Sequence, residues 1–116
     1  MKDDDDFERT VSFAKEKGIP VLIDFSANWC GPCKALKPDF EKLAASEDYS
    51  GSILFVEVDV DECSETQEKL EAFALPTIVL INSNGEEDRQ KRLAMTKIDQ
   101  AVIEEKILST LFVKEK

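Results

Sequence analysis

Cys30 and Cys33 form a Cys-x-x-Cys pair at the point where a strand pattern gives way to a helix pattern. Before the pair, Val21 to Phe25 is a short apolar run, typical of a strand that is covered on both faces. After the pair, apolar residues recur at helical spacing as far as Ala44. A strand that passes into a helix through this pair favours an α/β arrangement and places Cys30 at the helix N-terminus.

Three further helices are predicted from the spacing of apolar residues. Residues 6–17 read as an amphipathic helix, and Gly18 and Pro20 follow it as stop signals. The third helix of the chain is expected to carry Cys63, Leu70 and Phe73 on one stripe. A long C-terminal helix is marked by apolar positions at Ile98, Val102, Ile103, Ile107, Leu108 and Leu111.

Three further strands complete the predicted sheet. Ile53 to Val60 is rich in β-branched and aromatic residues and is expected to run parallel to the first strand. Thr77 to Ile81 ends at the turn sequence Asn82-Ser83-Asn84-Gly85, so Glu87 to Ala94 is expected to pair antiparallel with it. The order predicts one α/β domain, residues 1–116, with a mixed sheet of four to five strands flanked by helices on both faces.

The charge balance excludes several classes of partner. The 116 residues carry a formal net charge of −10, which repels nucleic-acid phosphates and anionic membranes. The start, Met1 to Asp6, has neither the basic patch nor the apolar run of a signal peptide, so a cytoplasmic location is expected. The acidic run Asp3 to Asp6 is interpreted as favouring a helix N-terminus, with a partner-binding tail as the alternative.

The cysteine count favours redox chemistry at Cys30 and Cys33 over a metal site. A structural zinc site needs about four Cys or His ligands, and the chain has three Cys and no His. No metal is therefore expected. At a helix N-terminus, free backbone N–H groups stabilise a thiolate, which is the nucleophile of thiol–disulfide exchange. Pro32 is tolerated in that first turn, and Gly31 keeps the approach to Cys30 open.

The residues around the pair resemble a known family. WCGPCK, preceded by VLIDFSAN, is similar to the active-site segment of the thioredoxin family. The later segment ILFVEVDVDEC resembles a strand of its animal-type cytosolic members. The resemblance implies a thioredoxin fold and a monomeric protein-disulfide reductase that uses a Cys30–Cys33 couple. It implies no bound cofactor, substrates that are disulfide-containing proteins, and reducing equivalents from NADPH through thioredoxin reductase.

The same resemblance assigns roles to further residues. Asp24 is the one carboxylate in an apolar strand, where burial raises a carboxyl pKa. The family pattern implies that it lies beneath the disulfide and accepts the proton of Cys33. Leu75-Pro76-Thr77 resembles a loop that faces the cysteines, with a cis proline and a Leu75 backbone that pairs with substrate. The implied substrate-binding residues are Trp29, Gly31, Pro32, Leu75, Pro76 and Thr77.

Three positions need separate interpretation. Cys63 matches a cysteine of animal-type members, and it is interpreted as a small core residue, with regulatory oxidation as the alternative. Glu57 stands where bacterial members often carry a lysine, so the pKa of Asp24 cannot be transferred from them. The segment with Ala94 and Met95 lacks the usual glycine, and either side chain could narrow the substrate groove.

Two other functions compete with disulfide reduction. One is a redox-inactive or regulatory thioredoxin-like binding module, which intact Cys30 and Cys33 disfavour. The other is a disulfide oxidase or isomerase, whose members tend to carry histidine where this chain has Pro32.

Overall fold

The computed structural model describes residues 3–111 and contains a mixed sheet of three strands in the order β2-β1-β3. The central strand β1 (Val21–Ser26) pairs parallel with β2 (Leu54–Asp59) and antiparallel with β3 (Thr77–Ile81). These pairings place Asp24 between Glu57 on one side and Ile78 on the other. The predicted mixed α/β sheet is confirmed, with three strands among the described residues instead of four or five.

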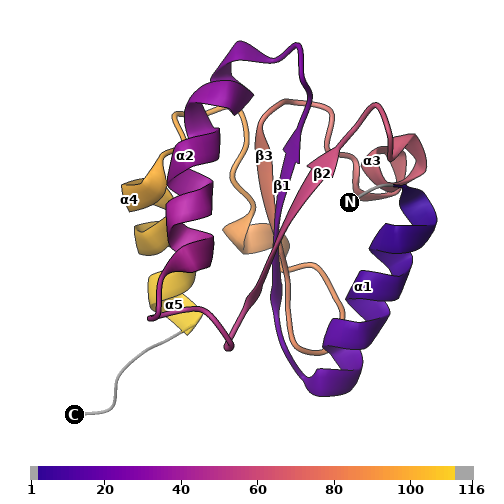
Figure 1. The fold of residues 1–116 in the computed structure, drawn as a ribbon, viewed down its shortest axis with the longest axis vertical. Coiled ribbons are helices and arrows are strands. Elements are labelled where there is room, and N and C mark those ends of the chain that lie inside the picture. The colour runs from indigo at the N-terminus through magenta and orange to yellow at the C-terminus, as the bar shows by residue number, and fades with distance from the viewer. Residues whose placement is uncertain (1–2, 112–116) are drawn as a thin grey trace.

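Helices cover both faces of this sheet (Figure 1). On one side lie α1 (Asp4–Lys17) and α3 (Ser64–Leu70). On the other side lie α2 (Gly31–Ala45), α4 (Gln100–Ile103) and α5 (Ser109–Leu111), with the π-helical turn η2 (Glu104–Leu108) joining the last two. The arrangement confirms the expected layers.

Alternation along β1 divides the core into two apolar clusters. Ile23 and Phe25 pack in the cluster that contains Phe7 and Ala14 of α1. Leu22 packs in the cluster that contains Leu36 and Phe40 of α2, together with Ile107 and Ile103. Since successive side chains of a strand point to opposite faces, Asp24 shares the α2 face with Leu22.

The helix α1 begins and ends at residues suited to those positions. The Asp3 carboxylate caps α1 by accepting from the Asp6 N–H at 2.8 Å, and Gly18 ends that helix in the left-handed conformation. The acidic residues Asp4, Asp5 and Asp6 occupy the first turn of α1, where the helix dipole favours them. The acidic run Asp3 to Asp6 therefore lies at a helix N-terminus, as the sequence predicts.

The segment Glu87 to Ala94 pairs antiparallel with β3 as predicted, but it does not form the continuous strand that was expected. Two isolated bridges, Ile81 with Glu87 and Ile78 with Leu93, flank a 3₁₀ turn, η1 (Arg89–Lys91). The Asp88 side chain accepts from Lys91 Nζ at 2.6 Å. This ion pair joins residues three positions apart and so lies within the turn. The turn at Asn82 to Gly85 forms as predicted, with the Gly85 N–H donating to the Asn82 carbonyl at 2.9 Å.

Two helix predictions also need correction. Phe73 is not on a stripe with Cys63 and Leu70, because α3 ends at Leu70 and Glu71 adopts a left-handed conformation (φ 56°). Phe73 lies beyond the helix and is exposed. Ile98 precedes the C-terminal helical segment, which begins at Gln100 after the cap residue Asp99.

Candidate functional site

Cys30 and Cys33 form a disulfide at the N-terminus of α2, with their Cα atoms 5.3 Å apart. Cys30 is the cap residue of the helix, and its sulfur accepts from the Cys33 N–H at 3.2 Å. In the reduced protein the same N–H and the helix dipole stabilise a thiolate on Cys30. The geometry is that of a dithiol–disulfide couple.

The sulfur pair lies at one end of the strands, where the end of β1, the start of α2 and the start of β3 meet. Chain direction brings the C-terminal end of β1 to the N-terminal end of β3, because these strands are antiparallel. The Leu75–Pro76 peptide bond immediately before β3 is cis, as the resemblance implied. Thr77 begins β3, and its hydroxyl donates to the Ala74 carbonyl. Leu75 packs against the apolar cluster that contains both cysteines.

The surface next to the disulfide is partly apolar and open. Trp29 is 69% exposed, and its indole Nε1 donates to Asp61 Oδ2 at 3.0 Å. Gly31 and Pro32 are exposed, and a Cβ added at Gly31 would meet no other atom within 4 Å. This openness is what an incoming disulfide requires.

Asp24 is fully buried and unusual in its surroundings. Neither carboxylate oxygen accepts a hydrogen bond from a described residue. The pKa of Asp24 is raised to about 7, mainly by desolvation and next by the nearby Glu57 carboxylate, while the Lys37 ammonium opposes the shift. A carboxyl group that titrates near neutral pH can both accept and return a proton under physiological conditions.

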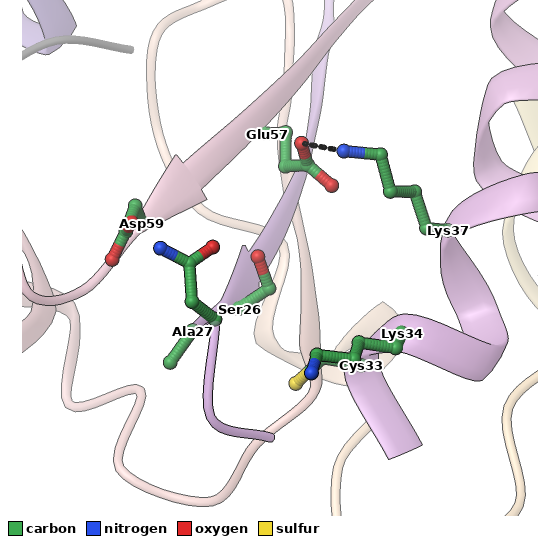
Figure 2. Close-up of a pocket in the computed structure, with 8 residues that line it drawn as sticks. Ser26, Ala27, Cys33, Lys34, Lys37, Glu57 and Asp59 are labelled. Atoms are coloured by element: carbon green, nitrogen blue, oxygen red, sulfur yellow. Dashed lines mark ion pairs between the residues drawn. The ribbon is translucent and has the colours of Figure 1, made fainter. Parts of the chain in front are cut away.

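A cavity of about 330 Å³ opens between β1, β2 and the start of α2. Figure 2 shows Cys33 at one part of its wall and the Lys37–Glu57 ion pair at another, with Lys37 Nζ 3.8 Å from Glu57 Oε1. Lys37 follows Cys33 by one helical turn, so both lie on the same face of α2. The wall of the cavity therefore contains the second cysteine together with the two charged side chains that modify the pKa of Asp24.

Cys63 lies apart from this arrangement. It is the cap residue of α3, is fully buried, and is not part of a disulfide. Burial is the main cause that raises the pKa of the Cys63 thiol, and the negative charge of Asp4 is the second. Both effects disfavour the reactive thiolate.

The segment with Ala94 and Met95 borders the cis-proline loop. Leu93 and Ile78 exchange two backbone hydrogen bonds, of 2.9 and 3.0 Å, and Met95 follows Leu93 by two residues just as Pro76 precedes Ile78 by two. Met95 is 90% exposed and has a positive φ of 58°. Met95, rather than Ala94, occupies the backbone conformation that favours glycine.

The structure brings the sequence-predicted residues Cys30, Cys33, Trp29, Leu75 and Pro76 to one edge of the sheet. It adds two residues that the sequence reasoning missed, Lys37 and Asp61. The helical spacing from Cys33 could have identified Lys37. Nothing in the sequence pattern marked Asp61 as the partner of Trp29.

Within residues 3–111 no three His, Cys, Asp or Glu side chains are grouped so as to hold a metal ion. No helix in that part of the chain has the length and apolar content needed to cross a membrane.

Comparison with known proteins places this site in context. A family model described as Thioredoxin matches residues 1–107. A thioredoxin H-type from Oryza sativa subsp. indica is 41% identical over 85 residues, which cover 73% of this chain and 67% of the relative. A thioredoxin from Pongo abelii is 45% identical over 80 residues, which cover 69% of this chain and 71% of the relative. The chain thus spans about two thirds of the length of these curated relatives.

Solved structures match over a larger share of the chain. A crystal structure of a poplar wild-type thioredoxin h superposes with a TM-score of 0.81 at 30% identity, covering 98% of this chain and 96% of that one. A Fasciola hepatica thioredoxin superposes with a TM-score of 0.76 at 31% identity, covering 92% and 93%.

Proposed function

This chain belongs to the thioredoxin family, and from that premise we propose that it is a thiol–disulfide oxidoreductase that reduces disulfides in other proteins. One observation carries the proposal: the Cys30–Cys33 disulfide closes at the N-terminus of α2, where the Cys33 N–H donates to the Cys30 sulfur. Reversible closure of that bond is the chemistry of the reaction.

The catalytic cycle starts from the reduced pair. The Cys30 thiolate attacks one sulfur of a substrate disulfide, forms a mixed disulfide and displaces the first substrate thiolate. Cys33 then loses its proton and attacks the Cys30 sulfur, which releases the second substrate thiolate and leaves the Cys30–Cys33 disulfide. Two electrons pass from the pair to the substrate, and a reductase must supply two electrons to restore the dithiol.

Asp24 is proposed as the acceptor of the Cys33 proton. Its pKa of about 7 suits that task. The proton route that we favour runs through the cavity bounded by Cys33, Lys37 and Glu57. Asp24 lies on the same face of the sheet as Glu57, and the charges of both Glu57 and Lys37 change its pKa. The proton returns to solvent at the end of the cycle.

Substrate binding is assigned to the cis-proline loop and the surface beside it. The backbone of Leu75 pairs with an extended substrate segment by β-strand addition. Trp29, Gly31, Pro32, Pro76 and Thr77 complete the proposed contact surface. The proposed partners are disulfide-containing proteins and a thioredoxin reductase that uses NADPH, and the proposed setting is the cytoplasm, with the protein as a monomer.

Cys63 is proposed as a core residue. Its burial and raised pKa support this role over regulatory oxidation. The animal-type subclass stays a prediction, because rice and Pongo abelii relatives have similar identities of 41% and 45%.

Turnover of insulin tests the proposed function. With NADPH and a thioredoxin reductase, the protein is expected to accelerate insulin reduction, and Cys30→Ser is expected to abolish the effect. A redox-inactive binding module would give no acceleration with the native protein, either with reductase or with dithiothreitol. An oxidase or isomerase would refold scrambled ribonuclease more effectively than it reduces insulin.

A further inference from the structure

The Arg92 side chain joins two parts of the chain that are distant in sequence. Its Nε and Nη2 donate to the two carboxylate oxygens of Glu87, each at 2.8 Å. Its Nη2 also donates to the Leu70 carbonyl at 2.5 Å, and its Nη1 donates to the Glu71 carbonyl at 3.1 Å. The Arg92 and Glu87 side chains are only 14% and 9% exposed. A planar guanidinium is the one side chain that can make this fork together with bonds to carbonyls.

These two carbonyls belong to the C-terminus of α3. Helix termini leave their last carbonyls without partners inside the helix, and Arg92 supplies partners from outside. Glu71 takes the left-handed conformation there, and the buried Ala72 donates its N–H to the Gln67 carbonyl at 3.0 Å. The chain then passes through Phe73 and Ala74 to the cis bond between Leu75 and Pro76. Arg92 therefore fixes the point at which this loop begins.

The residue after Arg92 fixes the point at which the loop ends. Leu93 donates its N–H to the Ile78 carbonyl at 3.0 Å and accepts from the Ile78 N–H at 2.9 Å. Ile78 follows Pro76 by two residues. Neighbouring residues 92 and 93 thus hold the two ends of residues 71–78, one by a side chain and the other by the backbone.

We propose that Arg92 is a positioning residue for substrate binding: it holds the loop that carries Leu75 and Pro76 at a fixed place relative to the Cys30–Cys33 pair. The inference rests on the proposed function. An extended substrate needs the Leu75 backbone and the Cys30 sulfur at matched positions, whereas a small disulfide needs the sulfur alone. Loss of Arg92 therefore weakens the binding of protein substrates and spares small ones.

The test compares two substrates in three variants. The probes are insulin and 5,5′-dithiobis(2-nitrobenzoate), a small aromatic disulfide. Arg92→Met removes all the bonds, and Arg92→Lys keeps the charge but loses the fork. Because Arg92→Met alone leaves the Glu87 carboxylate poorly paired, the double variant Arg92→Met/Glu87→Gln removes that charge and keeps the fold testable.

For the double variant we expect KM for insulin to rise at least about tenfold, since small misplacements of a binding element are costly. The rate with the small disulfide is expected to stay within about twofold of the native value, again because its reaction needs only the sulfur pair. Arg92→Lys is expected to behave like the double variant with insulin, because lysine keeps the positive charge but loses the planar fork of hydrogen bonds.

Arg89→Met is the matched control. Arg89 is 58% exposed in the same cluster, and its Nη1 lies 3.5 Å from Glu87 Oε1 and 3.6 Å from Glu71 Oε1. Loss of its charge is expected to leave both activities unchanged. Three outcomes overturn the proposal: an unchanged insulin KM in a folded double variant, an equal loss with both substrates, or an equal loss in Arg89→Met. If the native protein reduces neither substrate, the proposed function itself fails, and the Arg92 proposal falls with it.

Discussion

At the scale of single residues, Asp24 is held in a state that destabilises the fold. Its carboxyl group is fully buried, accepts no hydrogen bond from a described residue, and has a pKa of about 7. An unfolded aspartate titrates near 3.9. Between these values the unfolded chain binds fewer protons than the folded chain, so the stability of the native protein decreases as the pH rises from about 4 to about 7. Above pH 7 the charged Asp24 lowers the free energy of unfolding by its full amount, roughly 4 kcal/mol.

Asp24→Asn is expected to remove this pH dependence and to slow turnover. The difference in unfolding free energy between variant and native protein should be small at pH 4, grow to pH 7 and stay constant above it. The buried amide offsets part of the gain, by about 1–3 kcal/mol. Urea unfolding at several pH values measures the difference, and insulin reduction measures the rate. Asp48→Asn, at an exposed aspartate, is the control. A difference that did not vary with pH would show that folding does not shift the pKa of Asp24.

Met95 carries a different cost, in its backbone. A left-handed conformation costs a residue with a Cβ about 1–2 kcal/mol, and Met95 has a φ of 58° with a side chain that is almost wholly exposed. Met95→Gly is therefore expected to stabilise the protein by about 1 kcal/mol, and denaturant unfolding measures this. Ala94→Gly is the control. Ala94 has no positive φ, so a glycine there is expected to destabilise by about 0.5–1 kcal/mol. Equal effects at the two positions would contradict the argument.

At the scale of elements, the Asp4 carboxylate joins α1 to the first turn of α3. Asp4 Oδ1 accepts from the Thr66 N–H at 2.7 Å and from the Thr66 hydroxyl at 2.6 Å, and Asp4 Oδ2 accepts from the Glu65 N–H at 3.4 Å. The hydrogen bond from the Thr66 side chain lowers the pKa of Asp4. An acid of α1 thus supplies the N-terminal partners that α3 lacks, because the cap residue Cys63 makes no side-chain hydrogen bond there.

Asp4→Asn is expected to lower the melting temperature at neutral pH and to speed the labelling of Cys63 by a thiol reagent, since the first turn of α3 then opens more often. Because the folded pKa of Asp4 is lowered, its stabilisation is present above about pH 4 and is lost as the pH falls through the folded value. The stability of Asp4→Asn should therefore decrease less steeply than that of the native protein as the pH is lowered into the acid range. Asp5→Asn, at an exposed neighbour in the same turn, should change neither property. A labelling rate that did not increase would show that Asp4 does not hold α3.

At the scale of the whole molecule, the sequence predicted the layers and the chemistry better than the edge of the sheet. The runs that became β1, α2 and β3 have clear apolar patterns, so burial decides their structure. The segment from Glu87 to Ala94 has no such pattern, and the contacts that decide it, between Arg92 and α3, join residues 22 positions apart. Phe73 was misassigned because the left-handed turn at Glu71, a residue with no special turn preference, ends the helix early.

The candidate site shows the same division. Cys30 and Cys33 could be located from local sequence, since their chemistry depends on a helix N-terminus that follows a strand. The cis state of Pro76 could come only from resemblance, because few X–Pro bonds are cis. Lys37, Asp61 and Arg92 act across elements, and their partners become visible only when the chain is folded.

Trapping of a mixed disulfide tests most directly the central claim that Cys30 attacks and Cys33 resolves. Reduced Cys33→Ser, mixed with insulin, is expected to give a covalent adduct that dithiothreitol releases, because this variant keeps the nucleophile at the N-terminus of α2 and lacks the resolving thiol. Peptide mapping should place the adduct on Cys30 and not on the buried Cys63. Cys30→Ser should give no adduct. Adducts formed by Cys30→Ser and not by Cys33→Ser would contradict the account.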